Sequence, residues 1–258
     1  MSPQPRSPSS DCELSVILPA YNAAPLLRRS LETLSAYLDG LGVSWEIVLV
    51  DDGSEDETAG QAERLCAQGN CRYVRLEENR GKGRAVSEGM LRARGKYRIF
   101  TDIDLPYSLD SIGRCYGLLA TGEAHAVFGN RKLPGSASDV ALPLLRRLGS
   151  RGFGWLAGAI IGRRDLDTQC GLKGFSGELA GVLFPMLRVE RFGFDVELSL
   201  LLNQAGVEIR SIPVRLVNQD VSTVTVLGGG LQTMLEMAGV WLRKALGRYD
   251  VQPLERFR

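Results

Sequence analysis

The sequence predicts an α/β fold in which a mostly parallel, twisted sheet carries helices on both faces. Short apolar runs alternate with helical segments through about residue 131, which is the pattern of consecutive strand–helix units. The run Trp45-Glu-Ile-Val-Leu-Val is nearly continuous in Val, Ile and Leu, as in a strand buried on both sheet faces. Several such runs end in polar turn residues, and the carboxyl ends of strands form the ligand crevice of open α/β sheets. We therefore expect a binding site at that edge of the sheet.

The expected elements follow the chain in a regular order at first. The first half gives strands at 14–19, 45–50, 72–76, 97–102 and 125–130, with helices at 24–39, 56–68, 82–94 and 109–121. The second half is less regular, with a helix at 141–161, a strand at 170–176, helices at 178–186 and 194–205, a strand at 208–217 and a helix at 230–246. No Pro/Gly-rich linker divides the chain, so one domain is expected over 13–247, between a disordered Pro/Ser-rich tail at 1–12 and a C-terminal tail at 248–258.

Length and composition are those of an ordinary globular protein. The chain has 258 residues, of which 44% are hydrophobic and 24% charged, and its formal net charge of +1 gives no overall attraction to nucleic acid. Five cysteines, an odd number without a Cys-x-x-Cys, indicate a reducing compartment and no structural zinc. Cys170 and the single histidine, His125, are expected to be structural. No apolar run reaches the roughly 18 uncharged residues that a membrane-spanning helix needs.

The acidic pair Asp102 and Asp104 directly follows the apolar run 96–101. Side chains at i and i+2 of a strand point to the same side, so both carboxylates could approach one hard divalent cation. Such a cation keeps coordination sites for phosphate oxygens, which suits an enzyme that handles a nucleotide diphosphate. The competing interpretation is an ordinary solvated turn, because aspartates are common in turns.

Three other segments are expected to meet this pair. Residues 19–22 and 51–54 end two earlier strands, and 78–85 opens a helix with the sequence Glu-Asn-Arg-Gly-Lys-Gly-Arg-Ala. Gly81 lets the backbone approach a ligand, the helix N-terminus favours anions, and Lys82 adds a positive charge. The segment is not a Walker A loop, because Gly-x-x-x-x-Gly-Lys-Ser/Thr is absent.

In this order, the four motifs resemble those of family 2 glycosyltransferases with the GT-A fold. The matching segments are Leu18-Pro-Ala-Tyr-Asn, Val50-Asp-Asp-Gly-Ser, Asn79-Arg-Gly-Lys-Gly-Arg-Ala and Thr101-Asp-Ile-Asp. Downstream, Asp167-Thr-Gln-Cys-Gly-Leu-Lys-Gly-Phe and Glu190-Arg-Phe-Gly-Phe-Asp-Val-Glu-Leu resemble the dolichyl-phosphate glucosyltransferase branch. Arg146-Arg-Leu-Gly-Ser-Arg-Gly is similar to the polyprenyl-phosphate mannose synthases. The resemblance implies a single GT-A domain with a nucleotide-sugar site at the carboxyl ends of its strands.

The resemblance also implies an activity. It indicates an inverting, metal-dependent hexosyltransferase that moves a sugar from a nucleotide diphosphate to a polyprenyl or dolichyl phosphate. Glucose from UDP-glucose is favoured, with GDP-mannose and UDP-N-acetylglucosamine as other donors. Asp102 and Asp104 are expected to bind Mg²⁺ or Mn²⁺. The expected donor contacts are Pro19, Ala20, Tyr21, Asp51, Asp52, Gly81, Lys82 and Asp102, with Asp51 favoured for the nucleotide base. The alternative for Tyr21, Asp51 and Asp52 is turn formation, and one of the two aspartates is expected to serve the turn alone.

A phosphate acceptor is largely dianionic at neutral pH, so it needs positioning and charge neutralisation more than a base. The expected acceptor-phosphate contacts are Arg131, Arg151 and Lys173, for which the alternative is a solvated surface cation. Asp195 is expected to orient groups near the sugar, although it could equally cap the helix that it opens. With a hydroxyl acceptor, Asp195 or Glu197 would instead be the candidate base.

The chain departs from its relatives in places. Ala23 replaces a usual Glu, and Pro106 stands where mannose synthases often have a Gln that helps hold metal. Many relatives carry transmembrane helices, whereas here the segment 142–161 favours peripheral contact with the cytoplasmic face of a membrane. The segment 231–246 fits a membrane contact and a core-packed helix equally. Three other functions stay open: a hydroxyl-acceptor transferase of surface polysaccharide or glycolipid assembly, a nucleotidyltransferase, and a non-catalytic nucleotide-sugar sensor.

Overall fold

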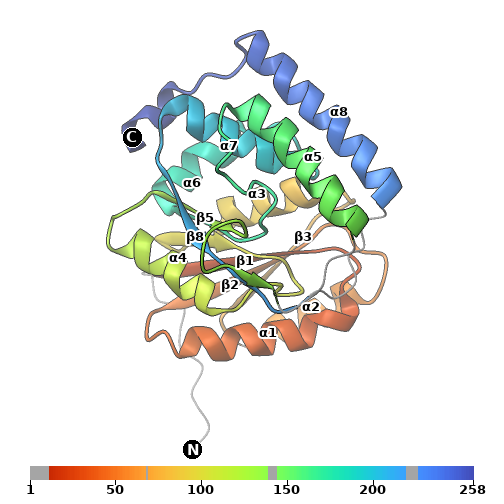
Figure 1. The fold of residues 1–258 in the computed structure, drawn as a ribbon. Coiled ribbons are helices and arrows are strands. Elements are labelled where there is room, and N and C mark those ends of the chain that lie inside the picture. Colours follow the sequence, from red (N-terminus) through yellow and green to blue (C-terminus); the bar gives the residue numbers. More distant parts are fainter. Residues whose placement is uncertain (1–11, 68, 139–143, 219–225) are drawn as a thin grey trace, which may run out of the picture.

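A sheet between two layers of helices forms the body of the protein (Figure 1). The computed structural model describes residues 12–67, 69–138, 144–218 and 226–258, and within 144–151 and 226–229 it describes the backbone alone. Predicted elements at 1–11 and at 141–143 therefore lie outside the described residues.

The main sheet has seven strands in the order β3-β2-β1-β4-β7-β5-β8. These strands are β1 (Leu14–Ala20), β2 (Trp45–Asp51), β3 (Cys71–Arg75), β4 (Tyr97–Phe100), β5 (Ala126–Asn130), β7 (Lys173–Ser176) and β8 (Ile209–Pro213). Strand β7 runs antiparallel to both of its neighbours, while the other pairs are parallel. A small second sheet pairs β6 (Ala137–Ser138) with β9 (Arg215–Leu216).

The helices divide between the two faces of the sheet. One face is covered by α1 (Ala24–Asp39), α2 (Thr58–Cys66) and α4 (Asp110–Ala120). The other is covered by α3 (Lys82–Arg92), α5 (Leu144–Ile161), α6 (Gly177–Leu183) with the short 3₁₀ turn Phe184–Met186, and α7 (Phe194–Ala205). Helix α8 (Val226–Ala245) packs outside them, against α5 and α7.

The apolar pattern of the sequence explains this layering. Strand β1 is buried along its whole length, as a strand covered on both faces must be. Helix α1 buries Leu27, Leu31, Leu34 and Leu38, which recur at the three- and four-residue spacing of one helix face. The predicted fold class is therefore confirmed, as are the type and order of the elements that the sequence predicted within the described residues.

Two boundaries differ in ways that matter for the site. Strand β4 ends at Phe100, so Asp102 and Asp104 lie on a turn after the strand and not on its end. The single strand expected at 208–217 is two strands, β8 and β9, which pair with different partners. The expectation that both carboxylates share a side because of strand alternation was therefore based on the wrong local structure.

The C-terminal segment also differs from the expected tail. Residues Gln252–Phe257 form a 3₁₀ helix in which Leu254 and Phe257 are buried in the core beside α6 and α7. The ring of Phe257 lies against His125, which supports the structural role expected of this histidine. Burial of two apolar side chains outweighs the polar character of the segment, which composition alone did not reveal.

The structure joins Cys66 and Cys71 in a disulfide, across a Cα–Cα distance of 4.6 Å. The cysteine count suggested a reducing compartment, and this pair does not support that inference. Cys66 is the last residue of α2 and Cys71 the first of β3, and the short connection between these elements brings the two side chains together. The sequence has no cysteine-spacing motif that predicts this disulfide.

Candidate functional site

The loops that follow β1 and β2 are tied to each other at the carboxyl edge of the sheet. The backbone N–H of Asn22 donates to Ser54 Oγ (2.9 Å), and Asn22 Oδ1 accepts from the N–H of Glu55 (2.9 Å). Asn22 has φ +48°, a left-handed conformation that asparagine tolerates. These bonds fix the loop on which Tyr21 lies, and the Tyr21 side chain is 37% exposed at the site.

The carboxylates of Asp51 and Asp52 accept hydrogen bonds that fix the neighbouring loops. Asp51 is fully buried, and its carboxylate accepts hydrogen bonds from the N–H of Ser54 and the hydroxyl of Tyr73, both at 2.9 Å. Asp52 is 4% exposed and accepts from the N–H groups of Arg80 (2.9 Å) and Gly81 (2.7 Å). Burial raises the pKa of Asp52 despite these two bonds. Each oxygen of the Asp51 carboxylate keeps a second acceptor site, so its expected contact with a nucleotide base stays a prediction.

The glycines of this region permit a close approach of two loops. A Cβ at Gly53, where φ is +68°, would lie 2.5 Å from the backbone carbon of Glu78. A Cβ at Gly81, where φ is +108°, would lie 2.9 Å from the carbonyl oxygen of Glu190. The loop 78–82 is therefore held between the end of β2 and the segment before α7, and it delivers Lys82 as the first residue of α3.

Lys82 and the acidic pair meet at the centre of the site. The Lys82 ammonium forms an ion pair with Asp102, and Asp104 and Asp195 also lie close enough to act on it. Burial alone would lower the pKa of Lys82, but these carboxylates outweigh it and raise the pKa. The turn is shaped by Leu105, whose N–H donates to the Asp102 carbonyl (3.0 Å) at φ +47°. The prediction that the pair lies beside Lys82 therefore agrees with the structure.

The two aspartates have the chemistry of a divalent-cation site. Magnesium is commonly held by one or two carboxylates together with substrate phosphates, and Asp102 and Asp104 supply that many. Within the described residues no third His, Cys, Asp or Glu completes a metal cluster. Pro106, at the position of a possible third ligand, is buried, and its carbonyl accepts the N–H of Val217 (2.9 Å). The residues present therefore fit a cation that is completed by a diphosphate.

Asp195 lies in the first turn of α7, and its carboxylate forms an ion pair with the buried Lys173. The ammonium of Lys173 is fully buried and donates to Asp195 Oδ1 (2.6 Å) and to the carbonyls of Thr168 (3.0 Å) and Cys170 (2.7 Å). An ammonium has three protons, and each has a partner here. The expectation that Lys173 contacts an acceptor phosphate is therefore at odds with the structure.

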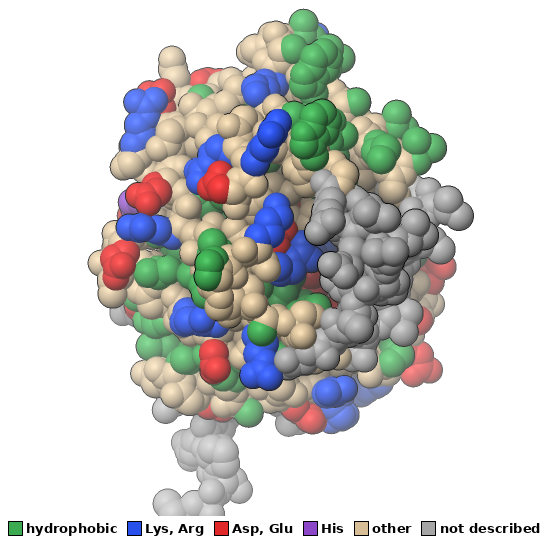
Figure 2. Space-filling view, in the orientation of Figure 1, with side chains coloured by type: hydrophobic (Ala, Val, Ile, Leu, Met, Phe, Trp, Pro, Cys, Tyr) green, Lys and Arg blue, Asp and Glu red, His purple; other side chains and the backbone are tan. Residues whose placement is uncertain are grey.

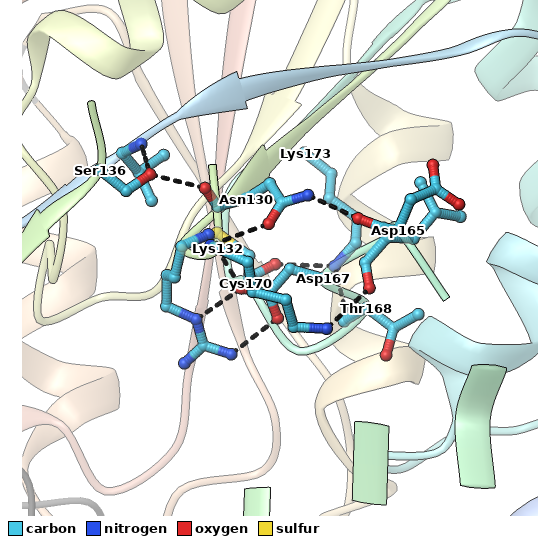
Figure 3. A network of polar contacts seen from close by, with 11 residues as sticks. Asn130, Lys132, Ser136, Asp165, Asp167, Thr168, Cys170 and Lys173 are labelled. Carbon is cyan, nitrogen blue, oxygen red and sulfur yellow. Dashed lines mark hydrogen bonds and ion pairs between the residues drawn. The ribbon is translucent and has the colours of Figure 1, made fainter. Parts of the chain in front are cut away.

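Arg131 is held by Asp167, a residue that sequence reasoning did not single out. Its guanidinium forms two parallel hydrogen bonds with the Asp167 carboxylate (2.7 and 2.8 Å), and its backbone N–H donates a third (3.1 Å). Burial would raise the pKa of Asp167, but Arg131 holds it below its usual value. The Arg131 side chain stays 38% exposed, so it can still meet a ligand. Figure 3 shows Asp167 in the same polar network as Lys132 and Lys173.

The other site residues predicted from the sequence are Glu197, Arg151, Pro19 and Ala20. Glu197 is fully buried and accepts the N–H groups of Arg188 and Val189 (both 2.8 Å) and the hydroxyl of Tyr249 (2.6 Å), so it is a structural residue and not a base. Arg151 lies on α5, but its side chain is outside what the structure describes. Pro19 and Ala20 end β1, which lies between β2 and β4 in the sheet.

Beside the loop 78–82 lies a polar hollow of about 560 Å³ that sequence reasoning missed. It is lined by Glu78, Asn79, Arg80, Glu190, Arg191, Gln232 and Glu236. Arg80 pairs with Glu190, and Glu236 accepts the N–H of Gly193 (2.8 Å) at the start of α7. These contacts join residues far apart in the chain, so the motifs around Arg80 and Glu190 named part of the lining without showing that they meet.

Helices α5 and α8 present apolar side chains to the surface. Those of Trp155, Leu231, Met234, Leu235, Trp241, Leu242 and Leu246 are 51–67% exposed. Figure 2 shows hydrophobic side chains gathered along this edge of the molecule. No helix within the described residues is both long and apolar enough to cross a bilayer.

This chain resembles known proteins both in sequence and in fold. Residues 15–187 match the family model described as "Glycosyl transferase family 2". A dolichyl-phosphate beta-glucosyltransferase of Dictyostelium discoideum is 30% identical over 96% of this chain and 79% of its own length, and one of Drosophila melanogaster is 31% identical over 96% and 80%. Among solved structures, glucosyl-3-phosphoglycerate synthase of Mycobacterium tuberculosis with Mn²⁺, UDP-glucose and phosphoglyceric acid has a TM-score of 0.66 at 20% identity, covering 89% of this chain and 80% of that one. At that identity the likeness concerns the fold.

Proposed function

The chain belongs to glycosyl transferase family 2, and on that premise we propose that it transfers glucose from UDP-glucose to a polyprenyl phosphate of the dolichyl type. The observation that carries the proposal is the meeting of Lys82, Asp102, Asp104 and Asp195 at one edge of the sheet. It occurs in a chain that resembles dolichyl-phosphate beta-glucosyltransferases over almost its whole length. A single displacement at the anomeric carbon would invert its configuration.

The donor would lie along the carboxyl ends of β1, β2 and β4. Asp102 and Asp104 would hold Mg²⁺ or Mn²⁺, which when bound neutralises the charge that develops on the leaving diphosphate. Lys82, at the N-terminus of α3, would bind phosphate oxygens directly. Tyr21, with Pro19 and Ala20 behind it, would contact the nucleoside. Asp51, Asp52 and Gly81 act indirectly, by fixing the loops that carry these groups.

The acceptor phosphate would meet arginine side chains. Arg131 is oriented by its two bonds to Asp167 and remains partly exposed, so its other N–H groups can receive a dianionic phosphate. Arg151 on α5 is the second proposed contact. Because a phosphate dianion is already a nucleophile, Asp195 needs only to orient groups around the sugar.

The lipid acceptor places the reaction at a membrane surface, and the exposed face of α8 suits that location. Leu231, Leu235 and Leu242 lie on one side of α8, while Met237 and Val240 on the other side are buried in the core. Glu236 is the only acid in the sequence of the helix and is bonded to Gly193. The basic residues of the last turn are held within the protein, since Arg243 donates to Tyr249 and Lys244 to the carbonyl of Ile160. The apolar stripe itself suits the surface of a bilayer, on the cytoplasmic face of which we propose that the protein docks peripherally.

The test is transfer of labelled sugar to a short polyprenyl phosphate. UDP-glucose, UDP-N-acetylglucosamine and GDP-mannose are offered in turn, with Mg²⁺ and with chelator, and organic-extractable label is counted. We expect chelator-sensitive product from UDP-glucose. Product from another donor would correct the sugar, and transfer to hydroxyl acceptors alone would correct the acceptor. The absence of lipid product with all three donors would refute the proposal.

A further inference from the structure

The buried lysine of the motif Asp167-Thr-Gln-Cys-Gly-Leu-Lys has no role in the proposed reaction so far. Lys173 begins β7, which runs antiparallel between β4 and β5, and it pairs in register with Phe100 and Phe128. Its ammonium lies 5.3 Å and 5.2 Å from the centroids of these two aromatic rings. A site between two phenylalanines could be filled by an apolar side chain, so packing alone does not account for a charge here.

The charge is explained by what the ammonium holds. Lys173 pairs with Asp195, Asp195 faces Lys82, and Lys82 pairs with Asp102. Side-chain exposure rises along this series, from 0% for Lys173 and 9% for Asp195 to 19% for Lys82 and 32% for Asp102. Charges of alternating sign thus lead from the interior of the sheet to the opening of the site, and Lys173 is the inner end.

The Lys173 ammonium also fixes the loop behind Asp102. It donates hydrogen bonds to the carbonyls of Thr168 and Cys170 in a tight turn of that loop (Figure 3). The next residue, Gly171, lies against the Asp102 carboxylate so closely that a Cβ there would be 2.1 Å from Oδ2. The same loop begins with Asp167, which orients Arg131. One ammonium therefore stabilises the surroundings of groups on both sides of the site.

We propose that Lys173 is a positioning residue, which holds Asp195 and the 168–171 loop in the arrangement that transfer requires. This inference rests on the proposed function, because it assigns Lys173 a part in that reaction. Lys173 does not touch substrate, since its side chain is fully buried and its three protons are bound within the protein. It acts on the reaction through Asp195 and through the loop behind Asp102.

The test is Lys173→Met, which removes the charge and keeps the length of the side chain. A misplaced active-site group can cost about 100-fold in rate, so we expect kcat to fall by about that factor. The KM for UDP-glucose should stay within about threefold, because the loop that presents Lys82 to the nucleotide phosphates is held by Asp52. Titration with UDP and Mn²⁺ should give the same stoichiometry as the wild type. A kcat within about fivefold of wild type, or a fall in kcat that matches a loss of binding stoichiometry, would overturn the proposal.

The matched control is Lys132→Met. Lys132 also donates to a backbone carbonyl beside the same loop, that of Leu166 (3.3 Å), but it is exposed. Its loss should leave kcat within about twofold of wild type. Wild-type protein assayed in parallel separates the two hypotheses. An inactive wild type refutes the proposed function, whereas an active wild type with an equally active Lys173→Met refutes only the role of Lys173.

Lys173→Met leaves a buried carboxylate without its partner, which strongly destabilises a fold, so a second variant that avoids this cost is needed. The double variant Lys173→Met/Asp195→Asn buries no unpaired charge, and it is compared with Asp195→Asn alone. Because Lys173 also holds the 168–171 loop, the double variant should retain less transfer than Asp195→Asn, with equal UDP affinity. Equal transfer by the two would contradict the role of the loop.

Discussion

Asp52→Ala is the substitution that best separates a scaffold role from a ligand contact. Asp52 is almost fully buried and accepts two backbone hydrogen bonds from the loop that presents Lys82. A hydrogen bond to a charged group contributes about 1.5–3 kcal/mol, which for two bonds gives about 3–6 kcal/mol. Because burial raises the pKa of Asp52, part of that gain is offset by desolvation. We therefore expect the free energy of unfolding to fall by about 2–4 kcal/mol.

The assay combines urea unfolding with titration of UDP in the presence of Mn²⁺. Loosening the loop 78–82 should weaken UDP binding by about tenfold or more, because Lys82 loses its fixed position. Asp56→Ala is the control: Asp56 also accepts backbone N–H groups, from Thr58 (2.9 Å) and Ala24 (3.3 Å), but on a loop that does not carry Lys82. It should cost about 1 kcal/mol of stability and leave UDP affinity unchanged. If Asp52→Ala abolished UDP binding without loss of stability, Asp52 would be a direct ligand contact and the scaffold reasoning would be wrong.

Three further predictions test other parts of the site. Asp104→Asn should raise the Mn²⁺ concentration needed for half-maximal transfer by about tenfold or more, since one of two carboxylate ligands is lost, and an unchanged metal requirement would exclude this site. Asp167 has its pKa lowered by Arg131, so its stabilising effect is present above the unfolded pKa of about 3.9 and is lost as the pH falls through the lower folded value. Asp167→Asn should therefore reduce the free energy of unfolding at about pH 7 by about 1–3 kcal/mol and flatten its decline below about pH 4, as measured by urea unfolding across pH; a curve parallel to wild type would speak against the pair. Leu235→Glu/Leu242→Glu should weaken co-sedimentation with phosphatidylcholine–phosphatidylglycerol vesicles by about 100-fold, at about 1.5–3 kcal/mol for each leucine, while transfer to a water-soluble acceptor persists. Leu91→Glu, at a 43% exposed leucine on α3, is its control, and equal binding by all variants would remove α8 from the membrane contact.

The first half of the fold could be predicted because its information is local. Strands such as β2 are continuous apolar runs, and each is followed by a helix whose period is visible within one segment. The position of the site follows from the same pattern, because parallel strands place their carboxyl ends at one edge of the sheet. The loops after β1, β2 and β4 therefore lie close together there. Asp102 and Asp104 do lie together, although for another reason than strand alternation, because a turn after β4 brings both carboxylates to Lys82. Their binding of a cation stays a prediction.

The errors arose where long-range contacts decide the role of a side chain. Lys173 carries the charge expected of a ligand-binding residue, and a linear motif cannot show that all three protons of its ammonium are already bound within the protein. Glu197 meets Tyr249 across 52 positions of the chain, and that contact excludes it as a base. The sequence motif identified the right neighbourhood in each case, but burial and partners had to be known before a role could be assigned.

The motif 167–173 illustrates how a functional pattern can be largely scaffold. Asp167 binds Arg131, Gly171 makes room for the Asp102 carboxylate, and Lys173 binds Asp195 and the loop itself. In the proposed mechanism none of these three residues touches the donor or the acceptor, yet each is matched to a side chain that acts at the site. A buried charge costs several kcal/mol unless it is paired, so replacing any one of these groups leaves another without compensation. The chemical groups and their supports are therefore coupled through Lys173, and the comparison of Lys173→Met/Asp195→Asn with Asp195→Asn measures how much of that coupling passes through the 168–171 loop.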